Sequence, residues 1–216
     1  MAYARITKDW EGQEGFIVCG GTSVTREVCE KLKGRNVIPI NSMYAWVPFA
    51  PCMFFADLKW WQREIKKWPH RLRNFKGLIY TITPAAKGHD NLRVLRRTKP
   101  PQVIVSKNDT VGMARTSLSA ALNIMVHKGV SKIYILGADN AYGAGAGDKR
   151  KAHCHSEHPW KRTPTTWKVK TAELQFSVEP LKRLGIEVFN CSPISTLPWW
   201  PRLDISTILN SQPRNS

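Results

Sequence analysis

Short apolar runs alternate with longer amphipathic stretches along most of the chain, and this alternation constrains the fold more than any other feature. It is typical of βα units, in which buried strands form a parallel sheet and helices cover its faces. The chain has 216 residues, 42% hydrophobic and 23% charged, which fits one globular domain. We therefore expect a single α/β domain over residues 1–209 and a frayed tail at 210–216.

The first βα unit carries a glycine turn. Its expected parts are a strand at 16–19, a turn at Gly20 and Gly21, a cap at Thr22 or Ser23, and a helix at 24–33 that stops at Gly34. Rossmann-like folds receive phosphates at such a turn, because glycines let the backbone approach and the helix N-terminus offers free N–H groups. The motif is not GxGxxG, so an ordinary turn is the alternative.

The other elements follow from the same periodicity. Strands are expected at 37–40, 52–55, 78–81, 103–105, 133–136 and 187–190, and helices at 60–68, 116–128 and from about 164 to 184. Pro39 predicts a sheet edge or a strand end, and Pro180 predicts a restart or a kink in the last helix. Together these elements predict a Rossmann-like domain with a mostly parallel sheet flanked by helices.

Three polar residues lie just past the ends of predicted strands, namely Asn41, Asp57 and Asp139. Ligands of open α/β sheets bind at the carboxyl ends of the strands, so these residues are candidates for binding a nucleotide. Each could equally be a loop cap. After Asp139 comes the glycine-rich stretch 141–147 and then a charged run at 148–151, which we expect to form a mobile loop.

The segment 153–158, HCHSEH, contains three of the six histidines. It is similar to the HxHxDH zinc motif of metallo-β-lactamase-fold hydrolases, but that fold needs a later histidine ligand and none follows His158. We favour a histidine that acts as a general base beyond the strand that ends at Asp139, and we predict no metal site. In the third interpretation the histidines belong to a solvated loop and have no role.

The formal net charge is +17, from 33 Lys and Arg against 16 Asp and Glu. Such an excess favours a polyanionic partner, and we expect nucleic acid or polyphosphate. Basic runs lie at 66–67, 71–73, 93–99, 149–151, 161–162 and 168–170, with Trp60, Trp61, Trp68, Trp160 and Trp167 among them. These tryptophans are candidate platforms for stacking bases.

The N-terminal fifteen residues have no apolar run, and no stretch approaches the roughly 20 apolar residues that cross a bilayer. We therefore expect a cytoplasmic protein with no membrane partner. Its five cysteines are odd in number and lack a CxxC pair, which suggests neither a disulfide framework nor a four-thiolate zinc site. Most of them are expected to be small buried hydrophobes.

The order of the motifs resembles the bacterial CMP-sialic-acid-dependent sialyltransferases. The matching motifs are CGGTS and INSMY after the first two strands, the block ARTSLSAALNIMVHKGVSKIYILGAD, a His-bearing loop, and GIEVFNCSP. The chain is also similar to Rossmann-type proteins of the pterin pyrophosphokinase group, and above all to short proteins encoded by tailed phages. The resemblance spans residues 15–193.

The sialyltransferase resemblance implies a set of site residues. The nucleotide would contact Gly20, Gly21, Thr22, Ser23 and Asn41, with Thr116 and Ser117 also approaching it. Tyr142 would stabilise the departing phosphate, and His155 or His158 would deprotonate the acceptor hydroxyl. The chain departs from the family at Gly21 and Thr22, where the family has Asn before Pro-Ser, and at Leu118, where it has Gly. It also lacks the family's lid and membrane-association segments, so sialic acid is not the expected donor sugar.

We therefore expect a transferase similar to glycosyltransferases that uses a nucleotide or nucleotide sugar and proceeds by direct displacement without a metal. No cofactor beyond the donor is implied. Lys149 or Arg150 would help Tyr142 to neutralise the leaving phosphate. The acceptor would be nucleic acid, in the cytoplasm of a phage-infected host. The alternative is a non-catalytic Rossmann-like phage module that binds nucleic acid or protein, and the zinc hydrolase is third. The oligomeric state stays open.

Overall fold

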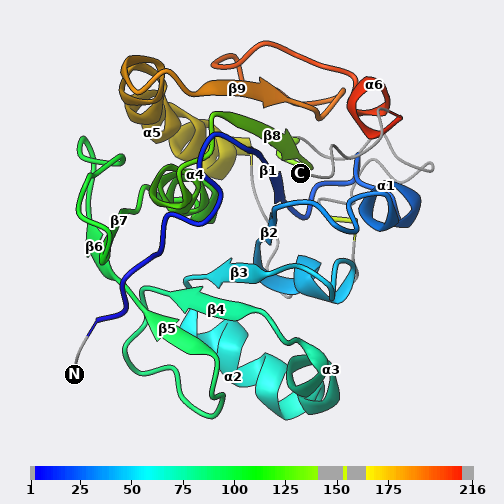
Figure 1. Cartoon of the computed structure of the whole chain (residues 1–216), viewed down its shortest axis with the longest axis vertical. Helices are drawn as coiled ribbons and strands as arrows, with labels where there is room; N and C mark the ends of the chain where they lie inside the picture. Colours follow the sequence, from blue (N-terminus) through cyan, green and yellow to red (C-terminus); the bar gives the residue numbers. More distant parts are fainter. Residues whose placement is uncertain (1–2, 141–152, 155–163, 211–216) are drawn as a thin grey trace.

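A parallel β-sheet organises the chain, and the computed structural model describes residues 3–140, 153–154 and 164–210, with side chains from 172 in the last range. The strands of this sheet are β1 (Glu14–Val18), β2 (Val37–Pro39), β3 (Cys52–Phe55), β4 (Leu78–Thr81), β5 (Leu92–Val94), β8 (Lys132–Leu136) and β9 (Glu187–Asn190). They stack in the order β5-β4-β3-β2-β1-β8-β9 (Figure 1). A single parallel bridge from Ile40 to Phe54 joins the β2-β1-β8-β9 part to the β3-β4-β5 part.

The strand order places a topological switch beside β1. The chain builds β1 to β5 outward in one direction and then returns to add β8 and β9 on the other side of β1. All the pairings between these strands are parallel, including Val18 with Pro39 and Val18 with Leu136 at the carboxyl ends of the three central strands. In such sheets the crevice for a ligand lies at the carboxyl edge next to the switch, so the fold directs attention to the residues after β1, β2 and β8.

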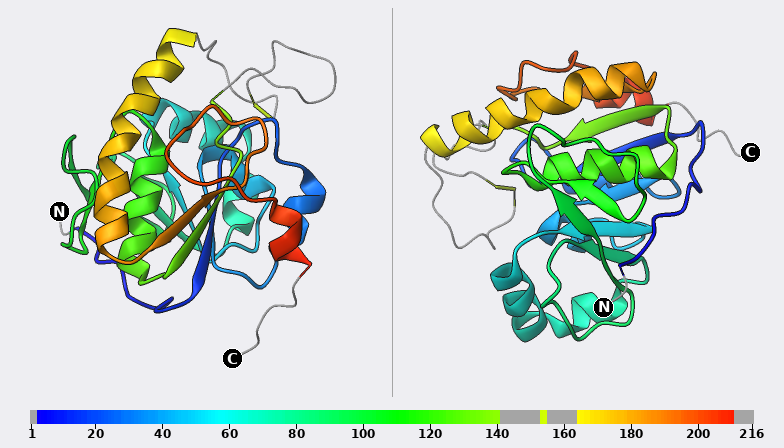
Figure 2. Two further views of the ribbon diagram at one scale, coloured as in Figure 1. Left: turned by 90° about the horizontal axis from the view of Figure 1, so that it is seen from above. Right: turned by 90° about the vertical axis from the view of Figure 1, so that its left-hand side faces the viewer.

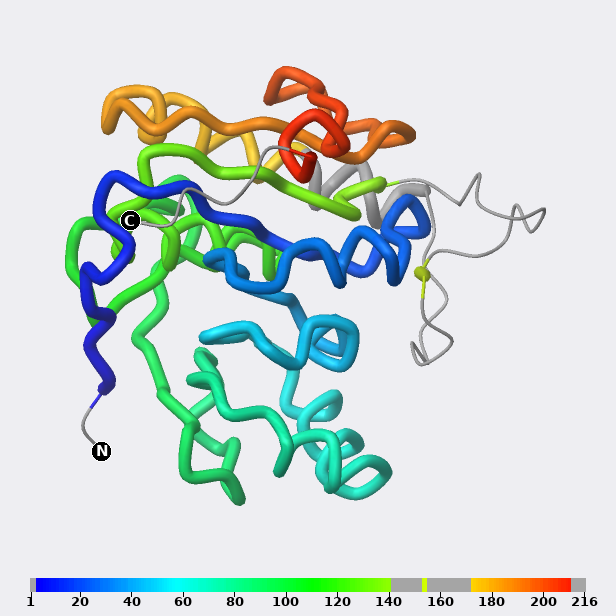
Figure 3. The backbone as a smooth tube through the Cα atoms, turned by 45° about the vertical axis from the view of Figure 1, so that its right-hand side comes forward, coloured from blue at the N-terminus to red at the C-terminus, as the bar shows by residue number. Residues whose placement is uncertain are grey.

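Helices cover both faces of the sheet (Figure 2). They are α1 (Arg26–Glu30), the 3-10 helix η1 (Asn41–Ala45), α2 (Leu58–Lys67), α3 (Pro69–Asn74), α4 (Ser117–Lys128), α5 (Pro164–Arg183) and α6 (Ile205–Leu209). Alternate β1 side chains face opposite ways, because Ile17 packs in the cluster of α4 and α5 whereas Phe16 and Val18 pack with α1, η1 and α2. Figure 3 shows α2 and α3 at one end of the strand stack and β9 at the other.

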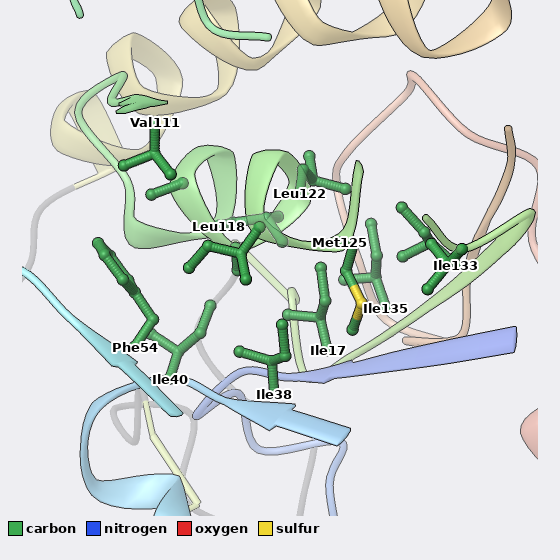
Figure 4. Close-up of a cluster of buried hydrophobic side chains, with 14 of the residues drawn as sticks. Ile17, Ile38, Ile40, Phe54, Val111, Leu118, Leu122, Met125, Ile133 and Ile135 are labelled. Atoms are coloured by element: carbon green, nitrogen blue, oxygen red, sulfur yellow. The ribbon is translucent and has the colours of Figure 1, made fainter. Parts of the chain in front are cut away.

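Helix α4 covers the strands next to the switch. Thr116 caps its start by accepting the Leu118 N–H at 3.3 Å, and Gly129 ends it with a φ of 85°. Leu118 and Met125 lie over the isoleucines of β1, β2 and β8 (Figure 4). Met125 lies against Gly15 at the start of β1, so α4 runs antiparallel to the strands and its N-terminus points to their carboxyl edge.

The structure confirms the predicted α/β class and most of the predicted elements. Pro39 is the last residue of β2, which is the strand end that its ring predicts. Cys29, Cys52 and Cys191 are buried, also as predicted. In the described parts of the chain, no helix has both the length and the apolar character needed to span a bilayer.

Two local predictions were wrong, and one alternative of a third is not found. The first helix is α1 alone, with Thr25 as its cap, because the side chains of Thr22 and Ser23 bond elsewhere. No strand forms at 103–105, where the Asn123 side chain accepts the Val105 N–H at 3.2 Å and donates to its carbonyl at 3.1 Å. Helix α5 continues through Pro180 to Arg183, so of the two expectations at Pro180 the restart is not found. Periodicity also missed η1, α3, α6, β5 and a two-stranded ribbon of β6 (Arg96–Thr98) and β7 (Thr110–Gly112).

Candidate functional site

The turn after β1 packs directly against the end of β8. Gly21 donates its N–H to the Gly137 carbonyl at 2.9 Å, and a Cβ on Gly21 would lie 2.3 Å from that same oxygen. No side chain fits there without a backbone shift. Gly137 is likewise held, at a φ of 68°, with its own Cβ position 2.3 Å from the Cys19 carbonyl. The two turns therefore interlock at the switch point.

Asp139 fixes the same turn from the other side. Its carboxylate is 2% exposed and accepts the Ser23 N–H at 2.9 Å, the Ser23 hydroxyl, and the Thr22 hydroxyl at 3.3 Å. These bonds hold the first turn against the end of β8, and they use the Thr22 and Ser23 donors that were expected to bind a phosphate. Cys19 lies in this buried environment, and burial, with Asp139 and Cys154 nearby, raises the pKa of its thiol to about 12.

Asn41 follows β2 at the same edge and is strained. Its φ is 53°, a left-handed conformation that costs a non-glycine residue free energy. Its side-chain oxygen Oδ1 is buried and has no hydrogen-bond partner among the described residues. Buried polar atoms are nearly always paired, so an unpaired amide oxygen on a strained residue at a sheet edge indicates a missing donor.

The start of the His-rich segment reaches this edge too. Cys154 donates its N–H to the Gly20 carbonyl at 3.0 Å, and the Nδ1 atom of His153 lies 3.2 Å from the same oxygen. The Cys154 thiol lies 3.5 Å from the Met43 sulfur of η1, two residues beyond Asn41. Segments far apart in the sequence therefore meet at the Gly20 turn.

The residues predicted to perform chemistry lie outside the described residues. These are Tyr142, His155 and His158, with Lys149 and Arg150 and the whole of the predicted loop at 141–151. No group of three or more His, Cys, Asp or Glu side chains in the described ranges could hold a metal ion. The zinc interpretation rests on the segment 153–158, of which only His153 and Cys154 are described.

Asp57, Thr116 and Ser117 all lie at helix starts. The Asp57 carboxylate caps α2, accepting the N–H groups of Lys59 at 2.8 Å and Trp60 at 3.3 Å, so its structural role is the loop cap of the alternative interpretation. Thr116 caps α4, and Ser117 is its first residue. The N-terminus of α4 is held by the neighbouring Arg115, whose backbone N–H and Nε both bond the Glu173 carboxylate of α5.

A cavity of about 510 Å³ opens beside the turn, between α1, the ends of β8 and β9, and the start of α6. Its wall includes Ser23, Gly137, Asn190, Cys191, Arg202 and Leu203. The Arg202 guanidinium donates to the carbonyls of Ser192 at 3.1 Å and Pro193 at 2.7 Å, which holds the loop after β9 in place. This volume is in the usual range for a small-molecule site. None of the site residues predicted from the sequence lies in the wall contributed by β9 and α6.

The stacking platforms predicted at Trp60 and Trp61 are not available. These side chains are 6% and 1% exposed, Trp61 stacks on Phe55 at 4.7 Å between ring centroids, and the Trp60 Nε1 donates to Ser42 at 3.0 Å. They belong to the core beneath α2 because their indole rings fill the space between that helix and the sheet. The side chains of Trp160 and Trp167 lie outside the described residues.

The parallel sheet with its switch at β1, flanked by helices on both faces, defines a Rossmann-like α/β protein. Among solved structures, the chain is similar to the sialyltransferase CstII from Campylobacter jejuni. In its complex with cytidine-5'-monophosphate the TM-score is 0.51 at 12% identity, over 94% of this chain and 86% of that one. In its complex with CMP-3FNeuAc the TM-score is again 0.51 at 12% identity, over 88% and 85%. No family model and no curated protein matches the chain.

Proposed function

We propose that this chain is a transferase of the glycosyltransferase type that uses a nucleotide or nucleotide sugar as donor. The nucleotide would lie at the carboxyl edge of the sheet, among the turn at 20–23, Asn41, Asp139 and the N-terminus of α4 at Thr116 and Ser117. Asp57, at the next strand end, is at the margin of this site. The fold it shares with an enzyme solved in complex with CMP and CMP-3FNeuAc supports a site for a cytidine nucleotide or a related donor.

The observation that carries the proposal is the unpaired, buried oxygen of Asn41. The left-handed backbone of Asn41 costs roughly 1 kcal/mol, and the missing hydrogen bond costs about as much again or more. A bound nucleotide has amino and hydroxyl donors that can bond this oxygen and offset both costs. The strain then has a function, since it holds an acceptor ready before the ligand arrives.

The proposed reaction is a direct displacement. His155 or His158 takes the proton of the acceptor hydroxyl as its oxygen bonds the transferred carbon, and the carbon–oxygen bond to the donor phosphate breaks. The electron pair leaves on the phosphate oxygen, where Tyr142 with Lys149 or Arg150 neutralises its charge. The turn at Gly21, held by Gly137 and Asp139, supplies a rigid wall for the nucleotide, and no step of this scheme calls for a metal.

Calorimetry with a panel of nucleotides and nucleotide sugars tests the site through Asn41→Gly. Glycine adopts the φ of 53° without strain, so we expect an unchanged or slightly higher free energy of unfolding. Loss of the acceptor should weaken nucleotide binding by about tenfold. His155→Ala and His158→Ala should leave binding intact, and the one that is the base should abolish turnover. Equal affinity of Asn41→Gly and the parent chain would exclude Asn41 from the site.

A non-catalytic module that binds nucleic acid is the second candidate, favoured by the net charge of +17. In the transferase proposal the same positive charge favours nucleic acid as the acceptor. The proposed place of action is the cytoplasm of a host cell. The two candidates differ in the calorimetry. Micromolar binding of a nucleotide donor supports the transferase, whereas duplex DNA binding with no ligand in the nucleotide panel supports the module.

A further inference from the structure

The helical unit α2–α3, residues 58–76, carries seven cationic side chains and a single acidic one. The cations are Lys59, Arg63, Lys66, Lys67, Arg71, Arg73 and Lys76. The acid, Glu64, is fully buried and accepts the Tyr44 hydroxyl at 2.6 Å, so it points into the core. The solvent side of this unit therefore carries cations and no acidic side chain. It projects beyond β4 and β5 at one end of the sheet (Figures 1 and 3).

Most of these cations lack an acidic partner. Elsewhere in the described residues basic side chains form ion pairs, such as Lys128 with Asp9 at 2.8 Å, Lys132 with Glu187 at 3.3 Å, and Arg183 with Glu179 at 3.2 Å. Within the same described ranges, Lys59, Arg63, Lys66, Lys67 and Arg73 have no carboxylate within ion-pair distance. The positive field of the unit is thus not neutralised by the protein itself.

The cations of α2 form a stripe. Lys59, Arg63, Lys66 and Lys67 follow a spacing of i, i+4, i+7 and i+8, which places them on one side of the helix. The stripe extends over roughly 12 Å of helix axis. Two guanidinium nitrogens of Arg63, Nε and Nη2, are enclosed and have no acceptor among the described residues. A phosphate oxygen of a ligand could accept hydrogen bonds from these two nitrogens once the Arg63 side chain turned toward the ligand.

The surroundings of the stripe argue against a membrane surface. A helix that lies on a bilayer inserts its apolar face. The apolar face of α2, formed by Trp60 and Trp61, is already buried in the protein core. Within the described residues, the large hydrophobic side chain that is clearly exposed is Leu184, at 55%, and it follows α5 at the far end of the molecule. The α2–α3 surface could therefore contact a bilayer only through its charges, because no large apolar side chain in the described part of the chain is exposed beside it to insert.

The surroundings also argue against recognition of unstacked bases. Trp68, between α2 and α3, is half-buried and has the Lys67 ammonium 4.6 Å and the Arg71 guanidinium 4.7 Å from its ring centroid. Both cations are thereby held beside the ring, and the ring is not free as a platform. Proteins that bind single strands usually combine a basic groove with accessible aromatic rings, whereas contact with phosphates alone is enough for a duplex.

We propose that the α2–α3 surface binds the phosphate backbone of double-stranded nucleic acid, independently of base sequence, through the Lys59, Arg63, Lys66 and Lys67 stripe. Binding at this surface does not require the transferase reaction, because none of the four stripe residues belongs to the proposed donor site. In a transferase, the same surface would hold a nucleic-acid acceptor.

The test compares two charge reversals in the full chain. Lys66→Glu with Lys67→Glu changes the stripe, and the control, Lys182→Glu with Arg183→Glu, makes the same change in net charge in the last turn of α5. All four residues are exposed and lie at helix C-termini, so their unfavourable interactions with the helix dipoles are alike. Binding of a short duplex DNA of mixed sequence is measured by fluorescence anisotropy over a range of salt concentrations, without any nucleotide donor.

We expect the stripe variant to bind at least about tenfold more weakly at about 0.1 M salt, and its log–log salt slope to be smaller in magnitude by about 2. The control should stay within about threefold of the parent chain, since it alters only the distant field. Equal losses in the two variants would show that net charge alone drives binding and would overturn the proposal. Tighter binding of a single-stranded oligonucleotide of equal length would also overturn it, as would binding of anionic vesicles but not duplex DNA.

The same variants separate this surface from the nucleotide site. If the surface proposal holds, Lys66→Glu with Lys67→Glu loses DNA affinity and keeps the nucleotide affinity of the parent chain, while Asn41→Gly shows the reverse pattern. If the stripe variant keeps its DNA affinity while Asn41→Gly loses nucleotide affinity, only the proposal for the α2–α3 surface is contradicted. If the stripe variant loses DNA affinity while Asn41→Gly binds nucleotides as the parent chain does, the proposed donor site is contradicted and the surface proposal is supported.

Discussion

Replacing Gly21 with alanine should destabilise the protein more than its small size suggests. The new Cβ would lie 2.3 Å from the Gly137 carbonyl oxygen, and 2.5 and 2.6 Å from the Cγ and Oδ2 atoms of Asp139. Two of the three contacts are with a carboxylate that already accepts bonds from Thr22 and Ser23. Relief therefore requires movement of the β1 turn as a whole away from the end of β8.

The expected cost follows from that movement. Overpacking in a well-packed region costs about 1–3 kcal/mol. Loss of the 2.9 Å bond from the Gly21 N–H to the Gly137 carbonyl adds about 1 kcal/mol. We expect a decrease of about 3 kcal/mol in the free energy of unfolding, which for a chain of this size lowers Tm by roughly 6–12 °C.

The matched control is Gly34→Ala. Gly34 has a φ of 81°, and a Cβ there would meet nothing within 4 Å, so its cost is backbone strain of about 1 kcal/mol. Urea titrations followed by tryptophan fluorescence and circular dichroism should give both values. If Gly21→Ala is no more destabilising than Gly34→Ala, the close contact between the β1 turn and the β8 end is refuted.

Two further predictions concern titratable groups. Burial lowers the pKa of His127, although its bond to the Thr110 carbonyl favours the charged form, so this residue stabilises the fold above its unfolded pKa of about 6.5. Its contribution is lost as the pH falls below that value toward the folded pKa, because the unfolded chain then binds the extra proton. The urea midpoint should therefore fall between about pH 7.5 and pH 5 by more in the parent chain than in His127→Gln, and equal falls would contradict this assignment. Burial also raises the pKa of the Cys19, Cys29, Cys52 and Cys191 thiols to about 12. A thiol reagent at about pH 8 should modify these four much more slowly in the folded protein than in urea, and fast reaction of all five cysteines before unfolding would contradict their burial.

The central strands could be predicted from the sequence because a short apolar run between turn residues is typical of a buried strand. Residues 52–55 and 133–136 are short apolar runs bounded by turn residues, and both form strands of the sheet. The stretch 103–105 is a run of the same kind but forms no strand, since the Asn123 side chain of α4 supplies its hydrogen bonds. A local pattern cannot show that a side chain 18 positions away replaces a neighbouring strand.

The candidate site was predictable in its position and less so in its contacts. The glycine turn, Asn41 and Asp139 all follow strand ends, and parallel pairing brings those ends to one edge. The sequence offered Ser23 to a phosphate, whereas in the structure its N–H bonds the Asp139 carboxylate. The strain at Asn41 and its unpaired oxygen are properties of a backbone conformation, and residue type alone does not specify them.

The sequence by itself determined the α/β class, the burial of the strands and the excess of positive charge, because these depend on local periodicity and on composition. Only the tertiary structure decided which strand ends meet at the switch, where the 510 Å³ cavity opens, and which cations remain without an acid. Those features arise from contacts between residues that are far apart in the chain, such as Thr22 with Asp139, 117 positions later. The free energy of such contacts depends on the whole packed arrangement, which no single segment encodes.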